Sequence, residues 1–555
     1  MTPSTFLEHL NVSVTLTANA TSATVDGGNV KQLNLDLELY GFTGTVRAWV
    51  FANDGEDAFY PLVSGTELLS LRLTLGKALY QVSPAPNPLT LEGIVTLRRL
   101  REIPSADLRG RPVLYREYEL EFQDSAQALW SHHRPTAVYA NTTLRDVVRE
   151  NTPKELTTQL KWSGLDEARN VVCLGLGDDQ ASFHDLVFWI ADREGAHVWY
   201  DYTAQRLVID DAKPSIGSPT NLALGALSGA QPIQVCFAPR RLEAVCVLNS
   251  REGTTQRLEV EQPDAVADIR RDYLIHTPLN APAKARQAVE ARRAAAGRYD
   301  VQVACGAYPE TYLAPGVVLK LADEFSDRLA VSGQPLRLLS MSLAVDATNQ
   351  LPEFDLASST TEYSCSVALR LEPDDDVRWR GPTYSAPRYP FEVEGRVLSA
   401  AGNTGDRSYT IYEHSDFYGS YKVYFPLWDA TVTIPVWPDF VPGHLYFPVP
   451  KDSRVFMSMQ FDSARIARFL EWGKDAAVPN ASQGNHLLLG QNDQSQTSIK
   501  HWYVDNVPQL ILSRVHAADR GTLTVDEGTL TLELTEEDGG DQPGTSDSAN
   551  AQENE

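Results

Sequence analysis

The segment Ser182–Asp211 restricts the fold more than any other part of the sequence, because it combines the signals of a capped helix and of a hairpin. Ser182 can cap a helix, and Gly195 is placed to end it. Between them, apolar residues recur at the three-four spacing of one helix face: Phe183, Leu186, Val187, Ile190 and Ala191. Two β-rich runs follow, HVWYD and RLVID, joined by the polar turn YTAQ. The segment therefore predicts a buried helix packed beside a hairpin.

Composition and patterning favour a mainly β protein with a few short helices. The 555 residues are enough for roughly three or four domains. Hydrophobic residues make up 43% of the chain, and its 33 Pro and 35 Gly are spread among short runs of Val, Leu, Thr and Tyr. From Val12 to Phe122, runs such as VSVTLTA and LNLDLELYG alternate in polarity and are separated by Gly, Asn, Asp and Pro. This pattern is typical of a sheet or barrel.

Charge and cysteine content argue against several classes of protein. The formal net charge of −25 disfavours nucleic acid as a partner, because binding a phosphate backbone relies on clustered Lys and Arg. The sequence has no apolar stretch as long as a membrane helix, and its first residues lack the pattern of a signal peptide. We therefore expect synthesis and folding in the cytoplasm, with any export by a route other than general secretion. Five cysteines without metal or disulfide spacing are predicted to be reduced core residues: Cys173, Cys236, Cys246, Cys305 and Cys365.

The usual catalytic motifs are missing from the sequence, which has no G-x-S-x-G elbow, H-E-x-x-H or P-loop. Gly175–Gly177 lacks the third glycine of a dinucleotide fingerprint, so a turn between strand and helix explains it. His132 and His133 would point to opposite faces of a strand, which disfavours a shared metal ion. We predict no catalytic, cofactor-binding or metal-binding residues, and a protein that is not an enzyme.

Three segments, in the same order along the chain, resemble the VgrG proteins of type VI secretion and the hub proteins of contractile phage tails. The first to occur is the strand Tyr115–Phe122 with the following helix that Thr143 can cap, although His132 and His133 partly replace the basic residues of the family's turn. The second is the block Ser182–Asp211. The third is the Ala- and Arg-rich helix in Pro282–Asp300, which precedes YLAPGVVLKL and LRLLSMSLAV.

The resemblance implies tandem hub β-barrels, an OB-fold barrel and a short C-terminal trimeric β-prism needle. The predicted domains are the two pseudosymmetric hub barrels with helical insertions (1–371), a connector (372–390), the OB-fold barrel (391–475), the spike (476–538) and an acidic, disordered tail (539–555). The barrel assignment rests on five or so short strands. The family's barrels share a strand, a turn and a second strand, which here match Tyr421–Trp428, Val441–Gly443 and Val455–Phe461. Its predicted core is Val423, Phe425, Val455, Met457 and Phe461.

The predicted spike contains two alternating runs on either side of Gly528. Strands this narrow cannot bury their apolar face alone, so three chains wound into a prism would turn that face onto a common axis. The predicted trimer core is Leu523, Val525, Leu530, Leu532 and Leu534. The alternative is one ordinary hairpin with Asp526, Glu527 and Gly528 at its turn. Residues predicted to dock a tip or cargo protein are Leu534, Glu536, Glu537 and Asp538.

What the resemblance implies about function is mechanical. It implies a homotrimer that adapts a sixfold inner tube to a threefold needle, punctures the target membrane and is delivered outside the cell or as part of an extracellular particle. The implied partners are the inner-tube protein, baseplate wedge proteins, a PAAR-type tip protein and cargo effectors. Two alternatives stay open: a phage-tail cell-wall hydrolase, and a carbohydrate-binding adhesin with an exposed platform of Trp428, Trp437 and Tyr446. The sequence does not separate a type VI apparatus from an extracellular particle or a phage.

Overall fold

The structure is a computed structural model, and it divides into two compact units. The first comprises residues 1–136, 143–168 and 175–388, and the second comprises 137–142, 169–174 and 389–555. The structure describes residues 7–536 except 56, 79–87, 107–108, 178–180, 223–232, 238–241, 252, 254, 263–264, 277–279, 295–298, 310–311, 322–327, 355, 357, 359, 399–419, 436–453, 472–484, 493–494 and 506. Among these residues, no helix is both long and apolar enough to cross a membrane.

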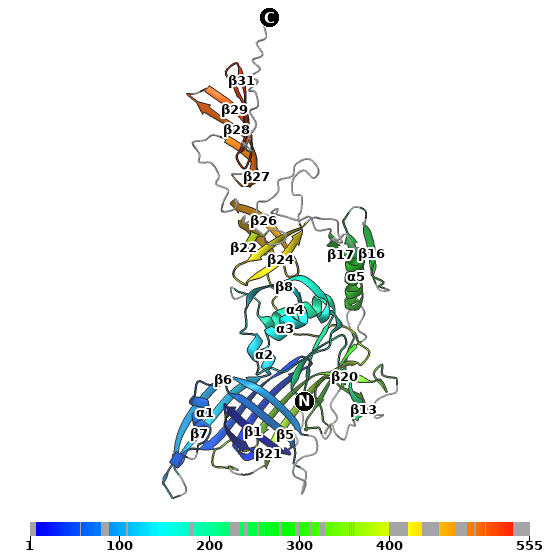
Figure 1. Ribbon diagram of the computed structural model, residues 1–555. Coiled ribbons are helices and arrows are strands. Elements are labelled where there is room, and N and C mark those ends of the chain that lie inside the picture. The colour runs from blue at the N-terminus through cyan, green and yellow to red at the C-terminus, as the bar shows by residue number, and fades with distance from the viewer. Residues whose placement is uncertain are drawn as a thin grey trace. The chain divides into compact units, whose positions relative to one another are not determined.

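The first unit is built on one large, mainly antiparallel sheet (Figure 1). Its strands are β1 (Leu7–Ala18), β2 (Thr21–Asp26), β3 (Val30–Glu38), β4 (Gly41–Phe51), β5 (Ser70–Lys77), β6 (Leu89–Ala106), β7 (Pro112–Gln123), β13 (Ile216–Leu222), β14 (Ile233–Phe237), β18 (Tyr299–Cys305), β19 (Val317–Leu321), β20 (Leu336–Ala347) and β21 (Thr360–Pro373). Eight of them pair in the closed order β20-β3-β4-β7-β6-β5-β1-β21, and β21 pairs with β20 again. The alternating pattern of β1 explains the closure, since Leu10, Val14 and Leu16 turn inward and are fully buried.

The paired strands β20 and β21 belong to this ring and also to a second branch of the same sheet, in which the order is β13-β19-β20-β21-β18-β14. Residues 340–346 of β20 pair with β3 of the ring, whereas Leu336 and Arg337 pair with β19. The sequence prediction of a mainly β fold is thus confirmed. The described strand pairings close one ring. The division of this region into two pseudosymmetric barrels therefore stays a prediction.

Helices and short strands pack beside the ring. They are α1 (Tyr60–Ser64), α2 (Ser125–Trp130), α3 (Leu144–Glu150), α4 (Phe183–Glu194), β9 (Thr158–Leu160), β11 (His197–Asp201), β12 (Arg206–Asp210) and the 3-10 turns η1 (Gly27–Asn29), η2 (Asn53–Gly55) and η3 (Ser163–Asp166). The predicted helix caps are confirmed: Ser182 and Asp185 form a capping box, and Gly195 ends α4 with a φ of 81°. Thr143 likewise caps α3 through the backbone N–H of Asp146.

The predicted hairpin β11–β12 is also confirmed, and it is fixed to the ring by a buried tyrosine. The Tyr202 hydroxyl lies 2.6 Å from the carbonyl oxygens of both Glu38 and Gly41, at the turn between β3 and β4. The two histidines lie in a turn, as the resemblance implied, and the strand assumed in the argument against a shared metal ion is wrong. His132 and His133 lie in the turn after α2 rather than on a strand, because the helix cap at Asp124 starts a helical turn in front of them.

A small α/β insertion carries the Ala- and Arg-rich helix. It consists of β15 (Glu243–Asn249), β16 (Gln256–Glu259), β17 (Val266–Ile275) and α5 (Asn280–Ala294), and so confirms the predicted helix. Two arginines of α5 contact the C-terminal end of α4. Arg292 donates a 2.6 Å hydrogen bond to the carbonyl oxygen of Gly195, and Arg293 forms a 2.8 Å ion pair with Asp192. Cations favour a helix C-terminus, so these contacts stabilise the docking of the insertion.

The second unit contains two five-stranded sheets. The first has the order β24-β23-β22-β25-β26, and its strands are β22 (Phe391–Val397), β23 (Ser420–Phe425), β24 (Ala430–Pro435), β25 (Arg454–Met459) and β26 (Ala464–Glu471). The second has the order β27-β28-β29-β30-β31, and its strands are β27 (Asn485–Asn492), β28 (Ser495–Val504), β29 (Val507–His516), β30 (Asp519–Asp526) and β31 (Thr529–Thr535). A two-stranded ribbon also belongs here, formed by β8 (Thr136–Thr143) and β10 (Ala168–Gly175).

We expect the substitution Asp124→Ala to lower the free energy of unfolding by about 2–4 kcal/mol, because it leaves buried donors unpaired. Asp124 is 1% exposed and accepts hydrogen bonds from the backbone N–H groups of Phe42, Ala126 and Gln127 at 3.3, 3.0 and 3.0 Å. Urea unfolding followed by fluorescence measures the loss. Asp124→Asn is the matched control, since it keeps one acceptor oxygen for the helix cap and should lose less.

The carboxyl group of Asp124 also makes the stability of the fold depend on pH. Burial raises the pKa of Asp124 from 3.8 to about 6, although hydrogen bonds from backbone N–H groups oppose the shift. A raised folded-state pKa favours folding at low pH, so this contribution is present below about pH 4 and is lost as the pH rises through about 6. Asp124→Asn should remove that part of the pH profile, and an unchanged profile would contradict the assignment.

Candidate assembly interface

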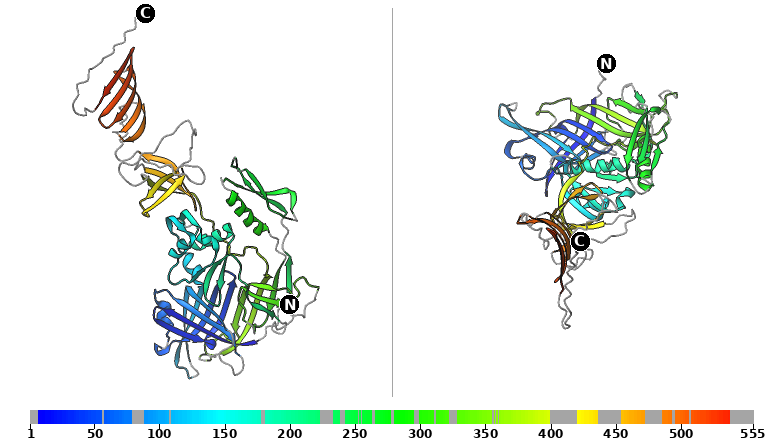
Figure 2. Two further views of the ribbon diagram at one scale, coloured as in Figure 1. Left: turned by 45° about the vertical axis from the view of Figure 1, so that its right-hand side comes forward. Right: turned by 90° about the horizontal axis from the view of Figure 1, so that it is seen from above.

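The sheet β27–β31 has two faces of opposite character, and its strand register defines them. Figure 2 shows its five strands side by side, in orange to red. Residues directly opposite one another in an antiparallel sheet point to the same face. Ile499 pairs with Leu512, Leu512 with Leu523, and Leu523 with Leu532. One apolar row therefore crosses the four strands β28 to β31.

The neighbouring rows extend this apolar face. Leu510 pairs with Val525 and Val525 with Leu530, while Leu534 pairs with Gly521 at the other end of β31. Its side chains are accessible in the single chain: Ile499 is 41% exposed, Leu510 40%, Leu512 38%, Val525 41%, Leu530 70%, Leu532 67% and Leu534 71%. Monomeric soluble proteins rarely expose a continuous apolar patch of this kind, so the face has the character of an interface.

The opposite face of the sheet is mainly polar, with Ile511 and Val515 among its apolar residues. Its paired residues include Ser498, Ser513, Thr522 and Glu533 in one row, and Lys500, Ile511, Thr524 and Thr531 in another. The alternation of Thr and Glu with Leu and Val, which is visible in the sequence, thus separates a mainly polar face from a mainly apolar one.

All five residues predicted for the trimer core lie on the apolar face: Leu523, Val525, Leu530, Leu532 and Leu534. The hairpin that the sequence left as an alternative also forms, with Glu527 and Gly528 in the turn between β30 and β31, and it supplies the last two strands of the sheet. Sequence reasoning missed Ile499, Leu510 and Leu512. The run PQLILSRVH contains the signal, because Leu510 and Leu512 alternate with Gln509, Ile511 and Ser513.

The predicted docking residues lie at the end of β31. Leu534 and Glu536 are exposed, whereas Glu537 and Asp538 fall outside the described residues, as does the predicted tail. Their role in docking therefore stays a prediction.

The predicted barrel core is buried as a group. Val423, Phe425, Val455 and Met457 are fully buried, and Phe461 is 2% exposed. If β22 to β26 are numbered 1 to 5, their order in the sheet is 3-2-1-4-5. That order is compatible with a small barrel, while its assignment to the OB class stays a prediction.

The ribbon β8–β10 completes this core, which sequence reasoning did not foresee. Val138, Val171 and Cys173 of the ribbon pack with Val423, Phe425 and their neighbours in one hydrophobic cluster. The Cys173 N–H donates a 2.7 Å hydrogen bond to the carbonyl oxygen of Phe461, and the Tyr389 hydroxyl donates one to the Cys173 carbonyl oxygen. Burial raises the pKa of the Cys173 thiol to about 12, so it stays protonated and unreactive.

The proposed aromatic platform is only partly described. Trp428 is half-buried against the barrel core, with its ring 6.3 Å from that of Phe425, while Trp437 and Tyr446 lie outside the described residues. This position gives Trp428 a packing role.

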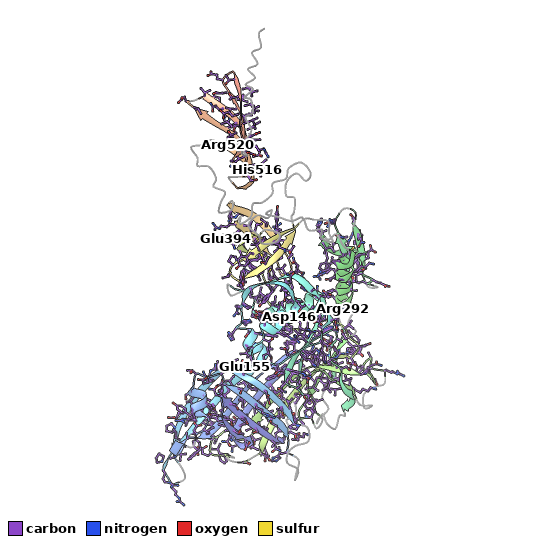
Figure 3. The ribbon with its side chains drawn as sticks, viewed as in Figure 1. Asp146, Glu155, Arg292, Glu394, His516 and Arg520 are labelled. Carbon is purple, nitrogen blue, oxygen red and sulfur yellow. The ribbon has the colours of Figure 1, made fainter. Side chains whose placement is uncertain are left out.

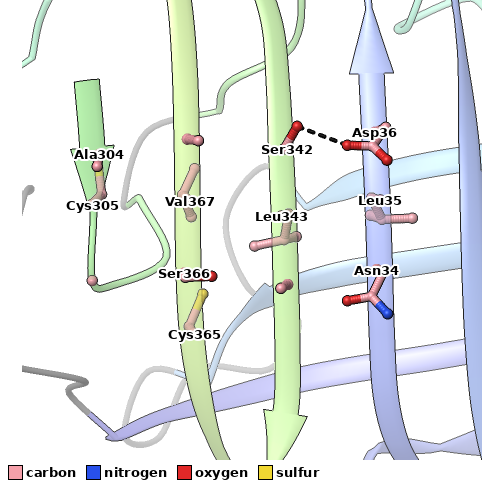
Figure 4. A pocket seen from close by; sticks show the side chains of 13 residues that line it. Asn34, Leu35, Asp36, Ala304, Cys305, Ser342, Leu343, Cys365, Ser366 and Val367 are labelled. Atoms are coloured by element: carbon pink, nitrogen blue, oxygen red, sulfur yellow. Dashed lines mark hydrogen bonds between the residues drawn. The ribbon is translucent and has the colours of Figure 1, made fainter. Parts of the chain in front are cut away.

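A groove of about 460 Å³ crosses β18, β21, β20 and β3 on the first unit. Figure 4 shows its floor, where the Ser342 hydroxyl donates a 2.7 Å hydrogen bond to Asp36. The exposed lining residues are small or polar, among them Asn34, Ala304, Ser366 and Ala368. Burial raises the pKa values of the Cys305 and Cys365 thiols beneath it to about 12. The described lining has no convergent acid, base or activated nucleophile that would indicate chemistry.

Comparison with known proteins gives matches only among solved structures, since neither protein-family models nor curated proteins match. A chain in a structure of the Francisella PdpA-VgrG complex, half-lidded, is 11% identical, with a TM-score of 0.68 over 96% of this chain and 89% of that one. A chain in the lidded form of that complex is 12% identical, with a TM-score of 0.69 over 96% of this chain and 80% of that one. These two matches span nearly the whole chain, and they show that it has a VgrG-like fold.

A third similarity is weaker. The E. coli c3393 protein, described as a component of the type VI secretion system, is 12% identical, with a TM-score of 0.45 over 82% of this chain and 99% of that one. It adds no weight to the first two matches.

Proposed function

We propose that this protein is the homotrimeric hub and spike of a contractile injection system. The single observation that carries the proposal is the apolar face of β27–β31, because a VgrG-like fold with an uncovered apolar sheet needs partners to bury it. Three copies would bury Leu530, Leu532 and Leu534 around a common axis and leave the Thr- and Glu-bearing face in water. Each leucine so buried contributes roughly 1.5–3 kcal/mol to assembly.

The proposed role is mechanical rather than catalytic. The hub adapts a sixfold inner tube to a threefold spike, and contraction drives the spike through the target membrane. Burial of three apolar sheets against one another makes the spike stiff, and stability then depends on assembly. The closed ring of eight strands and the buried carboxylate of Glu372 suit a part that transmits force without unfolding.

The proposed partners follow from the same role. An inner-tube protein and baseplate wedge proteins would contact the hub, and a PAAR-type tip protein or cargo effector would bind at the end of β31 near Leu534 and Glu536. In the similar solved structures, the VgrG chain is in complex with PdpA. We propose that this chain, likewise, carries at least one further protein.

The mass of the purified full-length protein in solution tests the proposal. Light scattering should give about three times the 61.4 kDa of one chain, and a chain that ends at Gly473 should assemble more weakly. A full-length monomer at micromolar concentration would overturn the homotrimer. Glycan-binding and cell-wall hydrolase assays on that monomer would then separate the two alternatives.

A further inference from the structure

Arg514 is a charged residue on the mainly apolar face of the spike sheet, which also carries Thr497, His516 and Asp519. It continues the alternation of Leu510 and Leu512 along β29, and its register partners are Thr497 and Gly521. Since β29 is the middle strand of the five, Arg514 does not lie at a free edge of the sheet. Three copies that bury Leu512 and Leu523 would therefore bring Arg514 to the margin of the buried region or into it.

Among the described residues of one chain, this guanidinium has no counterion. Arg514 is exposed and forms no ion pair with any residue that the structure describes. Burying an unpaired guanidinium costs several kcal/mol, whereas a paired one is tolerated when its hydrogen bonds are made. An apolar interface that includes Arg514 thus requires an acidic group from somewhere else.

Asp519 is positioned to supply that group. It lies on β30 opposite His516, and it alternates with Gly521 and Leu523, which places it on the apolar face. Among the paired residues of β28 to β31, it is the one acidic residue on this face. Figure 3 labels His516 and Arg520 at the same end of β29 and β30.

We propose that Arg514 of one copy forms an ion pair with Asp519 of a neighbouring copy, and that these pairs fix the register of the three chains. This inference rests on the homotrimer proposed above. Rows of leucine pack almost equally well after a slip along the strands, so apolar contacts alone specify register weakly. A pair between opposite charges is lost on slipping, which makes the correct alignment the favoured one.

Charge reversal in the full-length protein tests the pair. The variants are Arg514→Asp, Asp519→Arg and the double variant, and the matched control is Arg520→Asp, which changes the same charge on the polar face because Arg520 pairs with Val515. The readouts are the mass in solution and the hydrogen exchange rate of peptides from β29 to β31. The hydrogen exchange rate detects a loosened spike even if contacts between the hubs keep the three chains together.

Each single reversal should speed exchange in β29–β31 by about tenfold or more, since it places like charges in contact. The double variant should recover most of the protection, and Arg520→Asp should match the wild type. A trimeric wild type whose single reversals exchange no faster than Arg520→Asp, or whose double variant shows no recovery, would overturn the pair and leave the trimer standing. A monomeric wild type would instead overturn the proposed function itself.

Discussion

Replacing Leu532 by aspartate should prevent assembly of the spike. Leu532 is 67% exposed in one chain and continues the apolar row of Leu512 and Leu523. In the proposed trimer, the change removes the burial of one leucine per chain and places a carboxylate in an apolar interface. The expected loss in the free energy of assembly is on the order of 3 kcal/mol or more per chain, and it applies to each of the three chains.

Thr531→Asp is the matched control for Leu532→Asp. It adds the same charge at the next position of β31, but Thr531 pairs with Thr524 on the polar face. The mass in solution and the protease sensitivity of β27–β31 should change for Leu532→Asp and stay unchanged for Thr531→Asp. Equal behaviour of the two variants, with both spikes still protected, would show that the apolar face is not the assembly surface.

Local signals in the sequence predicted local structure well. Ser182, Asp185 and Gly195 determine the ends of α4 through hydrogen bonds within a few residues, so the sequence suffices to place that helix. The same holds for the alternating β30–β31 hairpin, whose two faces follow from a period of two residues. Neither prediction required knowledge of distant parts of the chain.

Features that depend on distant pairing could not be predicted in this way. The ribbon β8–β10 joins the core around Val423 although Val138 and Val171 are far from it in sequence, and short strands of mixed polarity do not indicate which sheet they will join. The branching of the large sheet at β20 is another such feature. Leu336 and Arg337 pair with β19, whereas the residues from Ser340 onwards pair with β3. Arg514 was missed because a charge at an alternating apolar position looks like a break in the pattern.

A buried ion cluster holds the segment after β21 against the rest of the first unit. Glu372, at the end of β21, is fully buried, and one of its oxygens lies 2.7 Å from Lys213 Nζ and 2.8 Å from Arg337 Nη1. Its second oxygen lies 3.1 Å from Arg380 Nε in the connector. Asp376 extends the cluster, at 3.8 Å from the Lys213 ammonium. One carboxylate therefore joins three cations from three separate parts of the chain.

Glu372→Gln should lower the free energy of unfolding of the first unit by about 3–5 kcal/mol, because it leaves Lys213 and Arg337 buried without their shared counterion. Urea unfolding measures the loss. Glu119→Gln is the matched control: its pair with Arg99 is at the surface, with side chains 36% and 60% exposed, and should contribute less than about 1 kcal/mol. Losses of similar size in the two variants would contradict the role of the buried cluster.

The pH dependence of Glu372→Gln provides a second check on the cluster. Burial already lowers the pKa of Lys213, and its attraction to Glu372 opposes this shift. Without that carboxylate the pKa should fall further. A base with a lowered folded-state pKa destabilises the fold while the solution is acid enough to charge it, and this penalty fades as the pH rises towards the ordinary lysine value. The variant should therefore regain stability relative to the wild type as the pH rises towards the ordinary lysine pKa of about 10.4. The further change Lys213→Met should restore part of the loss at neutral pH, because it removes a buried ammonium whose remaining acidic neighbour, Asp376, lies 3.8 Å away.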